Sequence, residues 1–212
     1  MISIGKFRFL ALLLVAILLA QNAEAVVVDF EDMTPATYNV GNSFTTSGVV
    51  VTAEQFQWSG GTWYAGGSAH IQSSTNAGGA GYEIHTNNIN LSFDFGLPCD
   101  GLSLQYGEYG GNINLEINGS LANVENFANL PATLGGTSIF VLDTGTPGQS
   151  TGAMFVIGVV GNIDSFKIGG QELWIDNVVA SVIPEPATVM LLGAGALAVL
   201  TRKRPKLRKE PL

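Results

Sequence analysis

Hydrophobic and polar residues alternate in short runs along residues 26–183. In the clearest run, Ile89, Leu91, Phe93 and Phe95 are separated by polar residues. A period of two is typical of a strand with one buried face. Similar runs occur at 26–31, 49–58, 102–106, 138–143 and 153–160. Short strands separated by Gly-, Asn- and Ser-rich segments predict an all-β fold, specifically an antiparallel β-sandwich.

One hairpin can be assigned with its register. Asn118-Gly119 is a pair suited to a type I′ turn, because both central residues of that turn need positive φ. A two-residue loop there pairs Ile117 with Ser120, Leu115 with Ala122 and Ile113 with Val124, and five of these six residues are apolar. The turn chemistry and the hydrophobic pattern therefore predict the same register.

Gly169-Gly170 predicts a second hairpin by similar reasoning. A two-residue loop there pairs Phe166 with Leu173 and places Lys167 opposite Glu172. Opposite charges facing each other across two strands contribute a few tenths of a kcal/mol.

The N-terminus has a different pattern. Lys6 and Arg8 precede the apolar run Phe9–Ala20, and Ala23-Glu24-Ala25 follows it. A basic stretch, an apolar stretch and an A-x-A site are the parts of a secretory signal peptide. We therefore expect residues 1–25 to be removed on export and the mature chain to begin at Val26.

The C-terminus, residues 182–212, has three parts in order. Pro184-Glu185-Pro186 comes first, an uncharged run over 187–200 follows, and Arg202, Lys203 and Arg204 begin a basic tail. An apolar helix followed by basic residues predicts a transmembrane helix with its basic end in the cytoplasm.

The same order resembles the PEP-CTERM sorting signal of Gram-negative bacteria. That resemblance implies that an exosortase reads Pro184-Glu185-Pro186 while the chain is anchored in the inner membrane. It also implies release to the cell surface or extracellular matrix. The predicted organisation is a signal peptide at 1–25, a sandwich domain at 26–181 and the sorting signal at 182–212.

Removing both ends changes the charge. Residues 26–183 contain one basic residue, Lys167, and fourteen acidic ones, a formal charge of −13. Binding to nucleic acid through phosphates needs Lys and Arg, so we expect no nucleic-acid partner. The lone Cys99 cannot form a disulfide within the chain, and we interpret it as a buried thiol.

The opening segment 26–31 and the closing segment 173–178 resemble strands of jelly-roll modules found in carbohydrate-binding and cell-surface proteins. In such modules the first and last strands lie close together and often hold a structural calcium. Asp29 and Glu31 share one face of the first strand, and Asp176 lies on the outer face of the last. Carboxylates are ligands that Ca²⁺ prefers, so these three residues are a candidate calcium site.

Aromatic residues are densest at 56–64, where Phe56, Trp58, Trp63 and Tyr64 occur with glutamines between them. Sugars stack on flat aromatic rings and form hydrogen bonds with amides. Trp58, Trp63 and Tyr64 are therefore a candidate glycan platform. Aromatic rings also fill cores, and alternation favours that alternative for Phe56 and Trp58.

Catalytic motifs are weak. Asp143-Thr144-Gly145-Thr146 is similar to the aspartic-protease signature, but that chemistry needs two aspartates and the motif occurs once. His70 and His85 have no second ligand at metal spacing. We expect a non-enzymatic, exported protein associated with exopolysaccharide. The alternatives are a polysaccharide-active enzyme and a structural matrix protein without a ligand.

Overall fold

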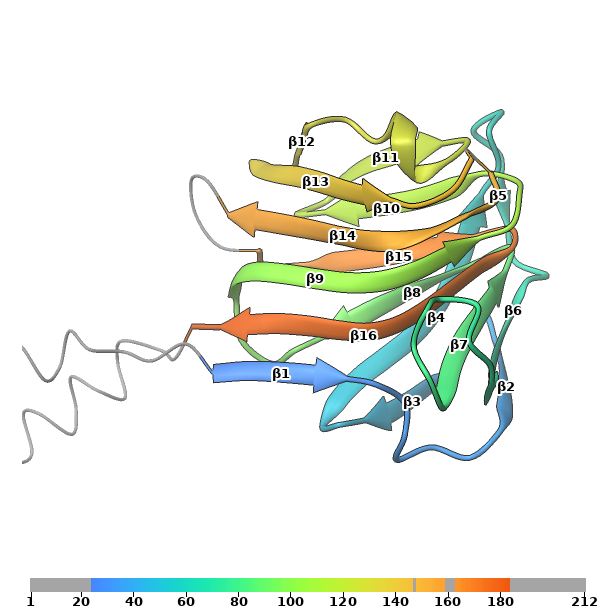
Figure 1. The fold of residues 1–212 in the computed structure, drawn as a ribbon, viewed down its shortest axis with the longest axis vertical. Helices are drawn as coiled ribbons and strands as arrows, with labels where there is room; N and C mark the ends of the chain where they lie inside the picture. Colours follow the sequence, from blue (N-terminus) through green and yellow to red (C-terminus); the bar gives the residue numbers. More distant parts are fainter. Residues whose placement is uncertain (1–23, 147, 159–162, 184–212) are drawn as a thin grey trace, which may run out of the picture. The chain divides into compact units, whose positions relative to one another are not determined.

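The structure, a computed structural model, describes residues 24–146, 148–158 and 163–183. Residues 23–183 form one compact unit. Two antiparallel sheets pack face to face (Figure 1), which confirms the predicted all-β sandwich. The only helical element among the described residues is one 3₁₀ turn, Phe127–Asn129.

The nine-stranded sheet contains both the first and the last strand. Its order is β12-β13-β14-β9-β16-β7-β6-β2, and β1 pairs with β16 beside β7. The strands are β1 (Glu24–Val28), β2 (Ala36–Asn39), β6 (Ser68–Ser73), β7 (Tyr82–Asn87), β9 (Cys99–Glu108), β12 (Thr133–Leu134), β13 (Thr137–Asp143), β14 (Ser150–Gly158) and β16 (Leu173–Val182).

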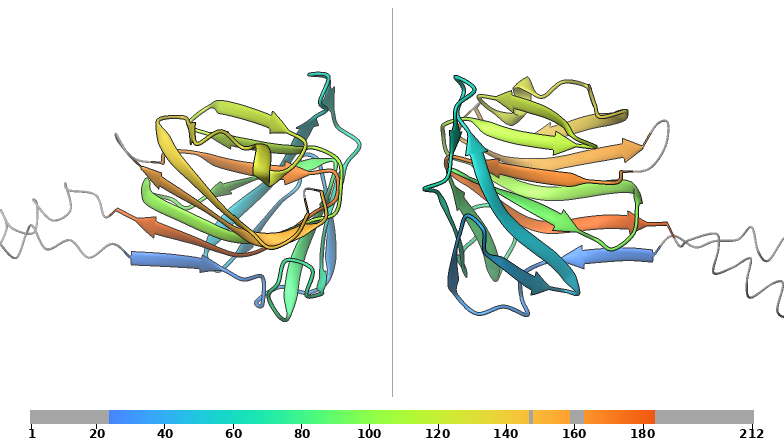
Figure 2. Two further views of the ribbon diagram at one scale, coloured as in Figure 1. Left: turned by 45° about the horizontal axis from the view of Figure 1, so that its top comes forward. Right: turned by 180° about the vertical axis from the view of Figure 1, so that it is seen from behind.

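The seven-stranded sheet is seen from its outer side in the right-hand view of Figure 2. Its order is β11-β10-β15-β8-β4-β3, and β5 pairs with the end of β4. The strands are β3 (Ser43–Thr46), β4 (Val49–Gln57), β5 (Trp63–Tyr64), β8 (Ile89–Asp94), β10 (Ile113–Ile117), β11 (Ser120–Val124) and β15 (Phe166–Gly170).

The core lies between the sheets and follows the predicted alternation. Ile89, Leu91 and Phe93 of β8 are buried, as are Leu104 of β9 and Ile175 of β16. Such interdigitated side chains supply most of the free energy that favours folding.

The hairpin at Asn118-Gly119 is confirmed in every pair. Ile113, Leu115 and Ile117 lie opposite Val124, Ala122 and Ser120, and the φ angles of Asn118 and Gly119 are 50° and 74°. The turn needs residues that tolerate positive φ, and the sequence supplies them.

The hairpin predicted at Gly169-Gly170 is wrong. Both glycines lie inside β15, which pairs with β10 and β8, whereas β16 belongs to the other sheet. Gly169 is needed for close packing instead of turning, because a Cβ there would lie 2.5 Å from Asn90 Oδ1. The chain therefore crosses from one sheet to the other between Gly170 and Leu173.

The two ends of the domain meet, as the jelly-roll resemblance implies. Val26, Val27 and Val28 of β1 pair with Ala180, Val179 and Val178 of β16. The predicted signal peptide up to residue 23 and the segment 184–212 lie outside the described residues. Within the part that is described, no helix is long and apolar enough to span a bilayer.

Candidate functional site

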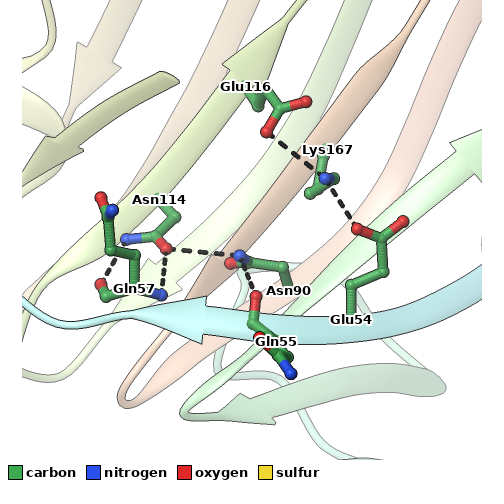
Figure 3. Close-up of polar contacts among 7 residues, drawn as sticks. All are labelled: Glu54, Gln55, Gln57, Asn90, Asn114, Glu116 and Lys167. Atoms are coloured by element: carbon green, nitrogen blue, oxygen red, sulfur yellow. Dashed lines mark hydrogen bonds and ion pairs between the residues drawn. The ribbon is translucent and has the colours of Figure 1, made fainter. Parts of the chain in front are cut away.

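Lys167 is the centre of a charged cluster on the outer face of the seven-stranded sheet (Figure 3). It points outward from β15, directly opposite Glu116 of β10. Its Nζ lies 3.3 Å from Glu116 Oε2 and 2.7 Å from Glu54 Oε2 of β4. The lysine reaches Glu54 across β8, where the register partner of Lys167 is the small residue Ser92. Its predicted partner, Glu172, forms neither of these contacts.

The cluster is half-buried, which shapes its electrostatics. The Lys167 side chain is 18% exposed, and those of Glu54 and Glu116 are 39% and 23% exposed. Burial alone lowers the pKa of Lys167, but the hydrogen bonds and charges of Glu54 and Glu116 outweigh it and raise that pKa above its ordinary value. The lysine is therefore a fixed cation held between two carboxylates.

A group of asparagines fixes the end of β4 beside this cluster (Figure 3). Asn114 Oδ1 accepts a hydrogen bond from Gln57 N at 2.7 Å, and Asn114 Nδ2 donates to Gln57 O at 2.9 Å. Asn90 Nδ2 donates to Gln55 O at 2.7 Å. Asn123 Nδ2 donates to Trp58 O at 3.0 Å. These bonds satisfy the backbone of residues 55–58 where it leaves the ladder with β8, and so position the short hairpin that carries β5.

The aromatic residues of this hairpin differ in exposure: Phe56 is buried, Trp58 is half-buried, and Trp63 and Tyr64 are exposed. Phe56 is fully buried and packs edge-on against Trp58, with ring centroids 5.8 Å apart. The Trp58 ring packs against Tyr64 at 5.6 Å. Trp63 and Tyr64 are 47% and 40% exposed. Of the three candidate platform residues, Trp63 and Tyr64 are thus exposed to solvent, and the half-buried Trp58 packs against Tyr64.

A groove of about 440 Å³ connects the aromatic hairpin to the charged cluster. Trp63 lines one part of it, and Glu54 and Lys167 line another. Gln55 and Thr52 add polar groups between them. The structure therefore combines an exposed indole, an amide, a hydroxyl and a charged pair around one concave surface.

The candidate calcium residues lie around the loop at 74–81. Asp176 is 1% exposed, and Gly79 passes so close that a Cβ there would collide with its carboxylate. Burial raises the pKa of Asp176 to about 6, a hydrogen bond from Asn177 N opposes this, and the charges of Glu83, Asp29 and Glu31 raise it further. The three predicted residues therefore share one acidic neighbourhood with Glu83, which the sequence analysis did not single out.

Each of these carboxylates has a hydrogen-bonding role of its own. Glu31 Oε1 accepts from Tyr82 N at 2.7 Å, and Glu83 accepts from Asn76 N and Ala77 N at 2.9 and 3.1 Å. In the described part of the chain, no three acidic, histidine or cysteine side chains are arranged to hold a metal ion. Calcium binding by Asp29, Glu31 and Asp176 stays a prediction.

The side chains of the weak catalytic motifs contact neighbouring residues of the fold. Asp143 Oδ1 accepts from Gly145 N at 3.3 Å in the turn after β13. His70 lies between Thr37 and Ser68, at 2.9 Å from each hydroxyl. His85 stacks on Trp174 at 4.4 Å, and burial, followed by the charge of His70, lowers its pKa. Cys99 is buried, as expected.

The sequence analysis did not identify two residues of the charged cluster on the outer face of the seven-stranded sheet. Glu54 and Glu116 carry no motif, and their pairing depends on which strands neighbour β15. One signal was available, because the fourteen acids of a domain with a single lysine make carboxylate neighbours the expected surroundings of that lysine. Pro184, Glu185, Pro186, Arg202, Lys203 and Arg204 lie outside the described residues.

Comparison with known proteins identifies the C-terminal signal. Residues 182–204 match the PEP-CTERM protein-sorting motif. The motif implies export, transient anchoring in the membrane and processing by an exosortase. No curated protein and no solved structure matches the chain.

Proposed function

We propose that this protein acts at the cell surface or in the extracellular matrix, where it binds exopolysaccharide without catalysing a reaction. One observation carries the proposal, namely the groove beside Trp63 on the outer face of the seven-stranded sheet. The sorting motif supplies the route by which the domain reaches a polysaccharide.

The groove has the chemistry that a sugar needs. A pyranose ring offers an apolar C–H face and a rim of hydroxyls. The exposed Trp63 indole provides a flat apolar surface for the first. Gln55, Glu54 and Lys167 provide donors and acceptors for the second. Because Lys167 is already fixed by two carboxylates, little side-chain entropy is lost when a ligand binds beside it.

The charge favours a neutral glycan. The cluster of Lys167, Glu54 and Glu116 has a formal charge of −1, and the domain around it is strongly acidic. An anionic polysaccharide would be repelled over the whole approach to the groove. Neutral polymers are therefore expected to bind more tightly than uronate-rich ones, and the difference should shrink as salt is raised.

The position of Lys167 supports a non-catalytic role. Hydrolysis by two carboxylates needs the glycosidic oxygen between an acid and a second carboxylate. Here the lysine ammonium lies between Glu54 and Glu116 and contacts both. A bound glycan would lie beside this pair and not between its members.

Affinity electrophoresis through gels that contain a neutral or an acidic polysaccharide tests the binding. Retardation by the neutral polymer should be lost in Trp63→Ala. It should be kept in Tyr109→Ala, which removes an aromatic side chain of similar exposure, 39%, from the loop that follows β9 of the other sheet. Equal loss in both variants, or none in either, would contradict the assignment of the groove.

Incubation with the same polysaccharides separates binder from enzyme. We expect no new reducing ends after prolonged incubation with the native protein. Their release, lost in Glu54→Gln, would favour the polysaccharide-active enzyme instead.

The sorting route has its own measurement. The intact mass of protein released by the native host should correspond to a chain that begins at Val26 and is cut near Pro184-Glu185-Pro186. Released protein that still carries residues 202–209 would show that the tail is not processed.

A further inference from the structure

An apolar ridge runs along the outer face of the nine-stranded sheet. Phe140 and Leu142 of β13 are 54% and 63% exposed, and Phe155 and Ile157 of β14 are 37% and 50% exposed. Phe140 and Phe155 are register partners, so the four side chains form one continuous strip. Contiguous apolar surface of this kind on a soluble domain marks an interaction site.

A groove lies directly beside the ridge on the same face. Small residues occupy the neighbouring outward positions, Gly101 and Ser103 of β9 and Ser181 of β16, next to Val179. The concavity between ridge and small residues measures about 450 Å³. Figure 1 shows β13, β14, β9 and β16 side by side in this order. The outer face of this sheet therefore carries both an apolar ridge and, beside it, a groove.

The strip is also free of charge. Among the described residues, the outward positions of β13 and β14 carry no acidic side chain, although the domain has fourteen acids. The exposed Asp100 lies at the start of β9, where the pairing with β16 is irregular. Two copies of so acidic a domain repel each other, and repulsion is least where neither copy brings a carboxylate to the contact.

We infer that this face binds a second copy of the same chain. A ridge beside a matching groove is self-complementary under a two-fold axis. Phe140, Phe155, Ser103 and Val179 form one row across the four strands. An axis parallel to the strands, between β14 and β9, places Phe155 over Ser103 of the second copy and Phe140 over its Val179. In the next row it places Ile157 over Gly101 of the second copy.

This arrangement has a directional consequence. Rotation about an axis parallel to the strands keeps β16 of both copies running in the same direction. Both chains then leave the pair at the same end, after Ile183. Two copies anchored in one membrane by the segment that follows would have the same orientation relative to that membrane.

The size of the face predicts a weak pair. Four strands span three spacings of about 4.8 Å, and over a length of about 30 Å they cover roughly 430 Å². Stable dimers bury about 800 Å² per partner. We therefore expect pairing to depend on co-anchoring in the membrane, which raises the effective concentration of one copy for the other.

Cysteine cross-linking in the membrane tests the pairing. Positions 140 and 179 of the two copies face each other across sheets stacked about 10 Å apart, which is too far for a direct disulfide but within reach of a thiol-specific cross-linker about 10 Å long. Within one copy the same positions lie three strand spacings apart, about 14 Å. The full-length chain with Phe140→Cys and Val179→Cys, treated with this cross-linker in host membranes, should give a covalent dimer on a denaturing gel. Phe140→Cys with Val50→Cys is the matched control, because Val50 is exposed on the other sheet.

A second variant tests the same contact by introducing a charge into it. Adding Phe155→Asp to the Phe140→Cys, Val179→Cys chain should abolish the covalent dimer, because two carboxylates would be brought into the apolar contact. The inference is overturned if the 140/179 pair cross-links no more than the control pair, or if Phe155→Asp leaves the dimer intact. A monomer whose binding to lipid vesicles is lost in Phe155→Asp would assign the face to the membrane surface and would equally overturn it.

Discussion

Replacing Asp176 by Asn should stabilise the domain at neutral pH, although Asp176 is a candidate calcium ligand. The side chain is buried on β16 beneath the loop at 74–81, and its surroundings include Glu83, Asp29 and Glu31. Burial first, and these charges in addition, raise the Asp176 pKa to about 6 from an ordinary value of 3.8. The ionised carboxylate is therefore costly in the folded state.

The sign and size of the effect follow from linkage. Between pH 3.8 and about 6 the folded state holds a proton that the unfolded state has lost. Stability therefore falls as pH rises through this window and stays at the lower value above it. Two pKa units correspond to at most about 3 kcal/mol. Asn removes this cost but loses the hydrogen bond from Asn177 Nδ2 to Asp176 Oδ2, worth about 1 kcal/mol. The net gain at pH 7.5 is expected to be about 1–2 kcal/mol.

Urea unfolding followed by tryptophan fluorescence measures this difference, with chelator present and at two pH values. The advantage of Asp176→Asn over wild type should shrink by about 2 kcal/mol between pH 7.5 and 4.5, because wild type becomes protonated there. Glu125→Gln is the control, since it removes an exposed charge and should change stability by less than about 0.5 kcal/mol. A variant less stable than wild type at pH 7.5, or a difference that does not vary with pH, would refute the reasoning.

The same experiment with millimolar calcium tests the metal prediction separately. An ion held by Asp29, Glu31 and Asp176 would offset the buried charge and stabilise wild type by mass action, by about 2.7 kcal/mol at a hundredfold excess over Kd. The shift should be absent in Asp176→Asn. If calcium leaves wild type unchanged, the calcium site is wrong, whereas the buried-charge argument stands.

Two further substitutions test the sheets. Asn118→Val should cost about 2–3 kcal/mol in urea unfolding, because the residue has φ of 50° and its Oδ1 accepts from Asp164 N at 2.8 Å; Asn118→Gly should cost less, since it restores the φ but not the hydrogen bonds, and equal stability of the two variants would contradict the turn. Lys167→Met should cost about 2 kcal/mol by leaving Glu54 and Glu116 without their shared cation. Glu172→Gln should leave the free energy of unfolding unchanged. A larger loss of stability in Glu172→Gln than in Lys167→Met would contradict the assignment of Glu54 and Glu116 as the partners of Lys167.

The sequence by itself determined the features that depend on neighbours in the chain. Asn118-Gly119 specified its hairpin because turn chemistry and alternation act over a few residues and agree. Alternation also identified which residues of 89–95 face the core. The sorting signal could be predicted because its three parts are read in linear order.

Only the tertiary structure decided which strands lie side by side. Gly169-Gly170 looked like a turn, but the chain crosses to the other sheet there, so Lys167 meets Glu54 and Glu116 and not Glu172. The sequence placed Asp176 on an outer face correctly, yet the loop at 74–81 covers that face and buries the carboxylate.

The groove beside Trp63 likewise forms between residues that are far apart in the chain. Alternation has a period of two and specifies a face, but it carries no information about the strand across from that face, which long-range packing selects.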